Sequence, residues 1–96
     1  SLYTGILICG PHSRSLMEML TNIDLREGIF PTMSCVQGRV ADIHCIVIRN
    51  DRKAMVAYEI YVTRDFGHYL WKSLWGRGSD FGLLPFGVEI LGRLNL

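Results

Sequence analysis

An acidic residue within an apolar segment is the first position in this sequence at which chemistry is expected. Glu59 lies in Tyr58-Glu59-Ile60-Tyr61-Val62, a run rich in aromatic and β-branched residues that is typical of a β-strand. Because successive side chains of a strand point to opposite faces, Glu59 and Tyr61 share one face. An unpaired carboxylate in apolar surroundings is energetically costly. Two interpretations stay open: Glu59 faces solvent, or it faces a ligand that compensates its charge.

Other side chains that could do chemistry have no suitable neighbours along the chain. None of the three histidines has a cysteine or carboxylate at the spacing of known metal sites, so we expect no metal centre. No serine or cysteine has a base at an evident spacing, and no catalytic residue is predicted. The segment Gly10-Pro11-His12-Ser13-Arg14 could place an anion at a helix N-terminus. It lacks the several glycines of a phosphate-binding loop, which favours an ordinary turn between a strand and a helix that begins with proline.

The size and composition indicate one small folded domain. The chain has 96 residues, of which 49% are hydrophobic and 20% charged. The mean hydropathy of +0.22 is high for a small domain. It fits either an apolar surface that meets another domain or subunit, or an unusually apolar core.

The charge pattern and the cysteines limit the classes of partner. The net charge is +1 and the basic residues form no stripe, so no nucleic-acid partner is expected. The uncharged stretches are too short to cross a membrane, so no membrane association is expected. The three cysteines have no paired spacing, which favours reduced thiols in the cytoplasm. Cys9 and Cys45 lie in apolar runs and are expected to be buried.

The first half of the chain predicts a strand, a helix and a hairpin. Residues 6–9 form an apolar run before Gly10-Pro11, and a helix is expected from Ser13 to about Asn22. A loop that places Phe30 in the core follows. Strands are predicted over 37–40 and 43–49, with Ala41-Asp42 as the turn between them.

The second half predicts a further strand and two helices. The polar tip 50–53 precedes the strand that contains Glu59. A helix is expected from about Arg64 to Trp75, ended by Gly76 and Gly78, and a last helix is expected from Pro85. The predicted order is β-α-β-β-β-α-α. The fold class is therefore α+β, an antiparallel sheet with helices packed on it.

The two ends of the sequence suggest a partial domain. The chain begins without methionine, and residues 90–96 form an apolar-periodic stretch without a stop signal. We therefore expect residues 1–96 to be a single partial domain of a longer protein, and not an enzyme by themselves.

The order and spacing of several segments resemble a known family. These segments are Ile8-Cys9-Gly10-Pro11 with Ser13-Arg14, Gly38-Arg39-Val40-Ala41 with Ile43, Ala57-Tyr58-Glu59-Ile60, Leu70-Trp71, Phe81-Gly82-Leu83 with Pro85, and Gly87 to Leu94. They are similar to the folate-binding aminomethyltransferase-like proteins, which include the glycine-cleavage T-protein and the C-terminal parts of sarcosine oxidase alpha subunits and of dimethylglycine and sarcosine dehydrogenases. Within that family, residues 23–25 and 30–34 look most like sarcosine oxidase alpha subunits.

The resemblance implies a ligand for Glu59. The family's Tyr-Glu strand matches Tyr58-Glu59, and its glutamate accepts hydrogen bonds from two adjacent N–H donors of the tetrahydrofolate pterin ring. On this basis we expect Glu59 to bind folate and tetrahydrofolate to be the cofactor. The family's catalytic aspartate lies upstream of the matched region. Flavin and NAD would bind only in other parts of the parent protein.

The resemblance also implies an activity and its alternatives. The parent would be a sarcosine-oxidase-like enzyme that oxidatively demethylates an N-methyl amine and passes the carbon to tetrahydrofolate, with other domains or subunits of a hetero-oligomeric oxidase as partners. Lys53-Ala54-Met55 departs from the family, which has a Gly-Glu pair in this loop. One alternative is thus a degenerate member that only packs against other subunits. Another is an aminomethyltransferase of the glycine-cleavage type.

Overall fold

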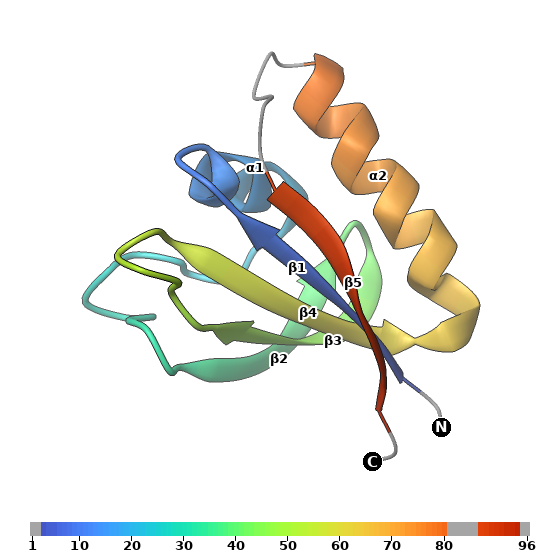
Figure 1. The fold of residues 1–96 in the computed structure, drawn as a ribbon, viewed down its shortest axis with the longest axis horizontal. Helices are drawn as coiled ribbons and strands as arrows, with labels where there is room; N and C mark the ends of the chain where they lie inside the picture. The colour runs from blue at the N-terminus through green and yellow to red at the C-terminus, as the bar shows by residue number, and fades with distance from the viewer. Residues whose placement is uncertain (1–2, 81–86, 95–96) are drawn as a thin grey trace.

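A five-stranded antiparallel sheet with two helices on one face forms the described part of the chain (Figure 1). The computed structural model describes residues 3–80 and 87–94. The elements in order are β1 (Tyr3–Cys9), α1 (Ser13–Leu20), β2 (Cys35–Val40), β3 (Ile43–Arg49), β4 (Ala57–Thr63), a 3-10 turn (Arg64–Phe66), α2 (Gly67–Asp80) and β5 (Gly87–Leu94). The predicted α+β class is confirmed.

The strand that carries Glu59 lies in the middle of the sheet. The strand order is β2-β3-β4-β1-β5, and every neighbouring pair is antiparallel. In this register Glu59 of β4 lies opposite Ile48 of β3 on one side and Leu7 of β1 on the other. The predicted strand 43–49 has the bounds of β3 and is paired on both sides.

The hairpin between β2 and β3 turns at the predicted residues. Val40 pairs with Ile43, and the intervening Ala41 and Asp42 have φ angles of 52° and 64°. Positive φ at both central residues is the geometry of the type I′ turn, which matches the twist of the flanking strands.

The core fills the space between the helices and one face of the sheet. Helix α1 contributes Leu16 and Met17 to it, and helix α2 contributes Leu70 and Leu74, all of them fully buried. Phe30 also reaches the core, as predicted. The sheet supplies a further set of buried apolar side chains: Ile6, Ile8, Val40, Ile43, Cys45, Val47, Tyr58, Ile60 and Val62.

The prediction for the two cysteines is confirmed only for Cys45. Cys45 is 1% exposed, and burial raises the pKa of its thiol to about 11. Cys9 is half-buried, because it alternates with the buried Ile8 and so points to the other face of the sheet.

The predicted last helix is wrong. Residues 87–94 form strand β5, which pairs with β1 along its length, whereas Pro85 lies outside the described residues. Val88 and Ile90 alternate with other residues at the two-residue period of a strand, and Gly87 and Gly92 are poor helix formers. The observed order is therefore β-α-β-β-β-α-β.

The predicted helix ends also need correction. Helix α2 continues through Gly76 and Gly78 to Asp80. Glycine ends a helix when it adopts a left-handed φ, and among the described glycines only Gly10 has one. The first helix ends at Leu20, two residues earlier than expected, and α2 begins at Gly67 after the 3-10 turn. None of the described helices has the length and apolar character needed to cross a lipid bilayer.

Candidate functional site

Glu59 lies on the face of the sheet opposite the two helices. Its strand neighbours Tyr58 and Ile60 are fully buried in the core under the helices, so alternation turns Glu59 and Tyr61 to the other face. This arrangement confirms the predicted division of the strand into two faces. Over the described residues, both helices lie against the opposite side of the sheet (Figure 1).

The Glu59 carboxylate accepts hydrogen bonds from three side chains. The Tyr61 hydroxyl donates to Oε1 at 2.6 Å. The Asn50 amide donates to Oε2 at 2.8 Å, and the Arg52 guanidinium donates to the same oxygen at 3.3 Å. Glu59 is only 9% exposed. Burial is thus compensated by donors, and Glu59 does not project into solvent.

These donors keep the carboxylate ionised. Burial raises the pKa of Glu59, but the hydrogen bonds from Tyr61 and Asn50 and the charge of Arg52 outweigh it, and the net shift is downward. Burial and the bond to Glu59 raise the pKa of Tyr61 to about 12. At neutral pH the site therefore presents a charged acceptor beside a protonated phenol.

The loop between β3 and β4 supplies two of the three donors. Arg52 and Met55 exchange two backbone hydrogen bonds of 2.9 Å around Lys53 and Ala54, whose φ angles are 50° and 65°. This tight turn folds Arg52 back toward the sheet. The sequence places residues 50–53 at a polar tip and misses the contacts of Asn50 and Arg52 with Glu59. The signal that could have found Asn50 is its two-residue spacing from Ile48, which shares the face of Glu59.

The surroundings of Glu59 on this face are largely apolar. Ile48 and Leu7 flank it across the neighbouring strands, and Ile46 lies opposite Tyr61. On the other side of Tyr61 the register places Gly5, which has no side chain. A flat ring that donates to Glu59 would therefore lie against aliphatic side chains.

A second charged cluster lies on the opposite side of the same loop. Arg49 is 3% exposed and donates to the carboxylates of Asp51 and Glu27 and to the Phe30 carbonyl. The hydrogen bonds that Arg49 donates to Asp51 and Glu27 raise the pKa of Arg49 above its already high ordinary value. The Arg49 bond likewise lowers the pKa of Asp51. This cluster ties the 26–33 segment to β3.

The segment from Gly10 to Arg14 has a structural role. The Ser13 hydroxyl, fully buried, donates to the carbonyls of Gly10 and Val56 at 2.9 and 3.1 Å. Ser13 thereby joins the start of α1 to the loop before β4. Within residues 3–80, no three His, Cys, Asp or Glu side chains are grouped as metal ligands would be.

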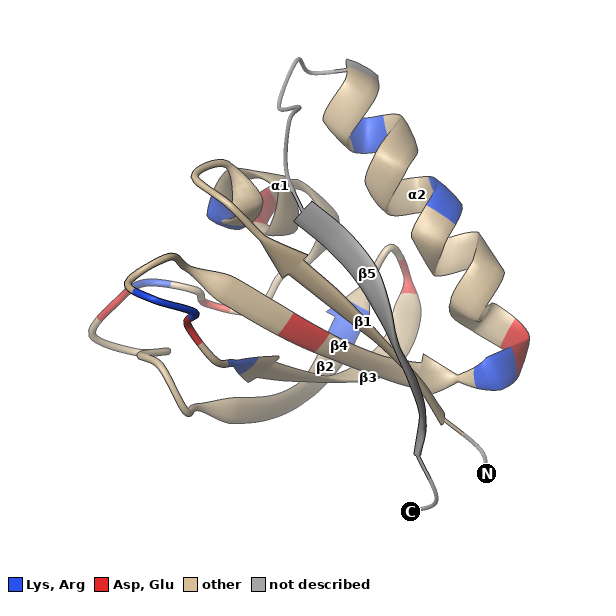
Figure 2. Cartoon of the chain, in the orientation of Figure 1, with Lys and Arg blue, Asp and Glu red and all other residues tan. Residues whose placement is uncertain are grey.

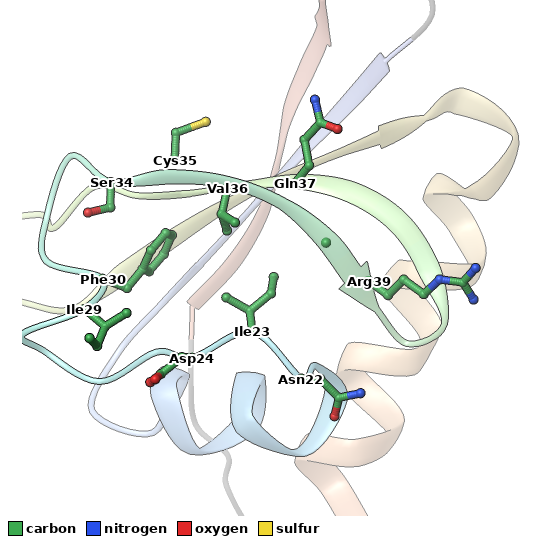
Figure 3. A pocket seen from close by; sticks show the side chains of 11 residues that line it. Asn22, Ile23, Asp24, Ile29, Phe30, Ser34, Cys35, Val36, Gln37 and Arg39 are labelled. Carbon is green, nitrogen blue, oxygen red and sulfur yellow. The ribbon is translucent and has the colours of Figure 1, made fainter.

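An open groove of about 820 Å³ lies away from Glu59, between residues 22–30 and strand β2 (Figure 3). Ile23, Phe30 and Val36 point into it, whereas Cys35 and Gln37 point to the other face of β2. Acidic and basic residues lie mostly in the loops and helices (Figure 2). The groove offers apolar packing, whereas the buried charge available to a ligand is at Glu59.

Comparison with known proteins identifies the family. The model of the GCVT N-terminal domain matches residues 1–96, the whole chain. The chain belongs to the GCVT N-terminal domain family. The suspected resemblance to aminomethyltransferase-like proteins is thereby confirmed.

Curated relatives of this GCVT-domain chain include three kinds of protein. It is 26% identical to the sarcosine oxidase subunit alpha of Rhizobium meliloti over 98% of the chain. It is 27% identical to the mitochondrial dimethylglycine dehydrogenase of Rattus norvegicus over 96%, and 26% identical to the aminomethyltransferase of Halothermothrix orenii over 98%. The chain spans 10%, 11% and 26% of the lengths of these relatives.

Proposed function

We propose that the chain forms the tetrahydrofolate-binding part of a sarcosine-oxidase-like enzyme in the cytoplasm. This enzyme oxidatively demethylates an N-methyl amine and passes the carbon to tetrahydrofolate. The observation that carries the proposal is the Glu59 carboxylate, ionised and nearly buried in the central strand, on the face without helices. The relative named sarcosine oxidase subunit alpha supports the choice of enzyme.

The chemistry of Glu59 fits the pterin ring of tetrahydrofolate. The ring presents two adjacent N–H donors, its ring amide and its 2-amino group. A carboxylate accepts both, and such charge-assisted bonds are roughly twice as strong as neutral ones. Ile48 and Leu7, which flank Glu59, provide apolar contact for the ring. A carboxylate has about four acceptor positions, and the protein's own donors use three, so one is open and a ring with two donors takes the second by displacing one of them.

The contribution of this chain is binding and orientation. Tyr61 and Asn50 fix the plane of the Glu59 carboxylate, since each donates to a different oxygen. When bound, tetrahydrofolate supplies the nitrogens that capture the one-carbon unit. Holding a reactant in a fixed orientation lowers the entropic part of the barrier. Proton transfer, flavin and NAD belong in this proposal to other domains or subunits of a hetero-oligomeric oxidase.

A structural role is the second candidate, and two observations favour it. Lys53-Ala54-Met55 replaces the Gly-Glu pattern that the family resemblance leads us to expect, and Met55 is 45% exposed. The helix-free face would then pack against another subunit without folate. A glycine-cleavage aminomethyltransferase is the third candidate, favoured by the relatives of that name.

Calorimetric titration of the full-length protein with tetrahydrofolate tests the proposal. We expect saturable binding that Glu59→Gln weakens at least about tenfold, because losing a bond to a charged group costs about 1.5–3 kcal/mol. The control is Glu18→Gln, since Glu18 is exposed on α1, on the other side of the sheet, and its side chain pairs with Arg14. The absence of binding by the unaltered protein would favour the structural role.

A further inference from the structure

The contacts of Glu59 show that this carboxylate cannot receive a two-donor ligand as it stands. Each carboxylate oxygen accepts about two hydrogen bonds. Oε2 already has two donors, Asn50 at 2.8 Å and Arg52 at 3.3 Å, whereas Oε1 has one, Tyr61. A ligand with two adjacent N–H groups needs one free position on each oxygen. One donor on Oε2 must therefore leave before such a ligand binds.

Arg52 is the donor that can leave most easily. Its bond to Oε2 is the longer of the two, and 43% of its side chain is exposed. Asn50 is fixed more firmly, because its short side chain bonds Oε2 at 2.8 Å from a backbone that donates to the Ala57 carbonyl at 3.0 Å. An ion pair whose long basic side chain is exposed is weak, since that side chain gives up conformational freedom to stay in place.

We propose that Arg52 is an internal competitor, whose guanidinium occupies the position on Glu59 that the ligand's amino group takes. The inference rests on the proposed function. A guanidinium and the 2-amino-4-oxopyrimidine part of a pterin both present planar N–H donors to a carboxylate. Arg52 thus satisfies Glu59 in the free protein and is displaced on binding. Its presence lowers the affinity of the site and favours ligands with two adjacent N–H donors, one to replace Arg52 on Oε2 and one for the open position on Oε1.

The turn that follows Arg52 keeps the competitor in place. Arg52 and Met55 form an isolated β-bridge, so the Arg52 backbone is fixed while its side chain reaches Glu59, seven residues along the chain. Lys53, the first turn residue, is exposed and supplies a matched cation in the same turn. Lys53→Ala removes the same charge as Arg52→Ala without removing a donor from Glu59.

Calorimetry with the isolated ring 2-amino-4-oxopteridine tests the competition, because this probe is neutral and has no tail. The full-length protein is compared with Arg52→Ala, Lys53→Ala and Arg52→Ala/Glu59→Gln. We expect Arg52→Ala to bind up to about fivefold more tightly, which is the upper value of an exposed ion pair. Lys53→Ala should bind as the unaltered protein does, and the double variant should bind weakly.

The salt dependence of ring binding distinguishes competition by Arg52 from a purely structural role of this residue. Raising the salt concentration screens the Arg52–Glu59 pair, so the ring should bind the unaltered protein more tightly, whereas the affinity of Arg52→Ala should stay level. Equal or weaker binding by Arg52→Ala, when the unaltered protein binds, would overturn the competition and leave the folate proposal standing. If neither protein binds the ring, the folate proposal fails, and the competition fails with it.

Discussion

Two charged side chains at the same end of the sheet, Arg49 and Glu59, are both nearly buried but differ in how completely they are paired. Arg49 of β3 faces the core side, and Glu59 of β4 faces the side without helices. The loop that follows β3 serves both residues. Asp51 pairs with Arg49, whereas Asn50 and Arg52 pair with Glu59.

The Arg49 cluster is complete. A guanidinium has five N–H donors. Arg49 makes five hydrogen bonds, two to Asp51, two to Glu27 and one to the Phe30 carbonyl. No donor remains for a ligand. A buried charge whose hydrogen bonds are all made within the protein fixes the position of the loop that supplies its partners.

The Glu59 cluster is incomplete, and one of its three donors is held loosely. Tyr61 and Asn50 bind the carboxylate at 2.6 and 2.8 Å, while the half-exposed Arg52 binds at 3.3 Å. A buried charge is therefore a better candidate for binding a ligand when the protein's own side chains leave some of its hydrogen-bonding positions open. Removing Arg49 should therefore affect folding, and removing the charge of Glu59 should affect binding.

Arg49→Met should have the largest effect on stability. Removing one member of a buried ion pair typically costs about 3–5 kcal/mol. We expect about 3 kcal/mol in the free energy of unfolding, because Glu27 is largely exposed and can return to water. Glu59→Gln should cost less, about 1–2 kcal/mol, since glutamine keeps one oxygen acceptor and the half-exposed Arg52 can turn to water. Urea unfolding of the purified variants measures both values.

The exposed Arg26–Asp24 pair provides the control for that comparison. Its side chains are 72% and 43% exposed, so Arg26→Ala should leave the free energy of unfolding nearly unchanged. If Glu59→Gln is as destabilising as Arg49→Met, the Glu59 cluster is structural, and the distinction between the two clusters fails.

The titration of Tyr61 should reveal its bond to Glu59. Burial and the bond to Glu59 raise the pKa of Tyr61 from its ordinary value of 10.0 to about 12. Because the folded state holds this proton more tightly, the stabilisation is complete below about pH 10 and is lost as the pH rises toward 12. In Glu59→Gln the pKa should fall partway, since burial alone still raises it. Ultraviolet titration measures the shift, and Tyr61→Phe identifies the transition. An unchanged pKa in Glu59→Gln would contradict the hydrogen bond.

A glycine substitution in the turn that follows Arg52 should have the smallest effect on stability. Ala54 has a φ of 65°, a left-handed conformation that glycine adopts without steric cost. We expect Ala54→Gly to stabilise the protein by about 0.5 kcal/mol, the steric gain being partly offset by the greater freedom of the unfolded chain. Asp42→Gly in the β2–β3 turn is the matched change, with a φ of 64°. Destabilisation by Ala54→Gly in urea unfolding would show that the turn is not held as described.

The sequence predicts the regular parts of this molecule well, because periodicity reports burial directly. The strand 43–49, the turn at Ala41-Asp42 and the shared face of Glu59 and Tyr61 follow from two-residue alternation. The segment 87–94 is misread because a short apolar run fits either a helix or a strand. Only its pairing with β1 decides between them.

The candidate site is predicted less completely, since its partners depend on strand register and turn geometry. Glu59 stands out as an acid among apolar residues, but Asn50 and Arg52 reach it only because β3 and β4 pair as they do. Arg49 gives no sequence signal of its burial, because Glu27 lies 22 residues away in a loop without periodicity.

A crystal structure of the full-length protein with tetrahydrofolate tests the central claim most directly. The account predicts the pterin ring beside β4, with its ring amide and 2-amino nitrogens about 2.7–2.9 Å from the two Glu59 oxygens. Tyr61 and Asn50 should keep their bonds, and Arg52 should be displaced from Oε2. A pterin bound elsewhere, with the Arg52–Glu59 pair intact, would contradict it.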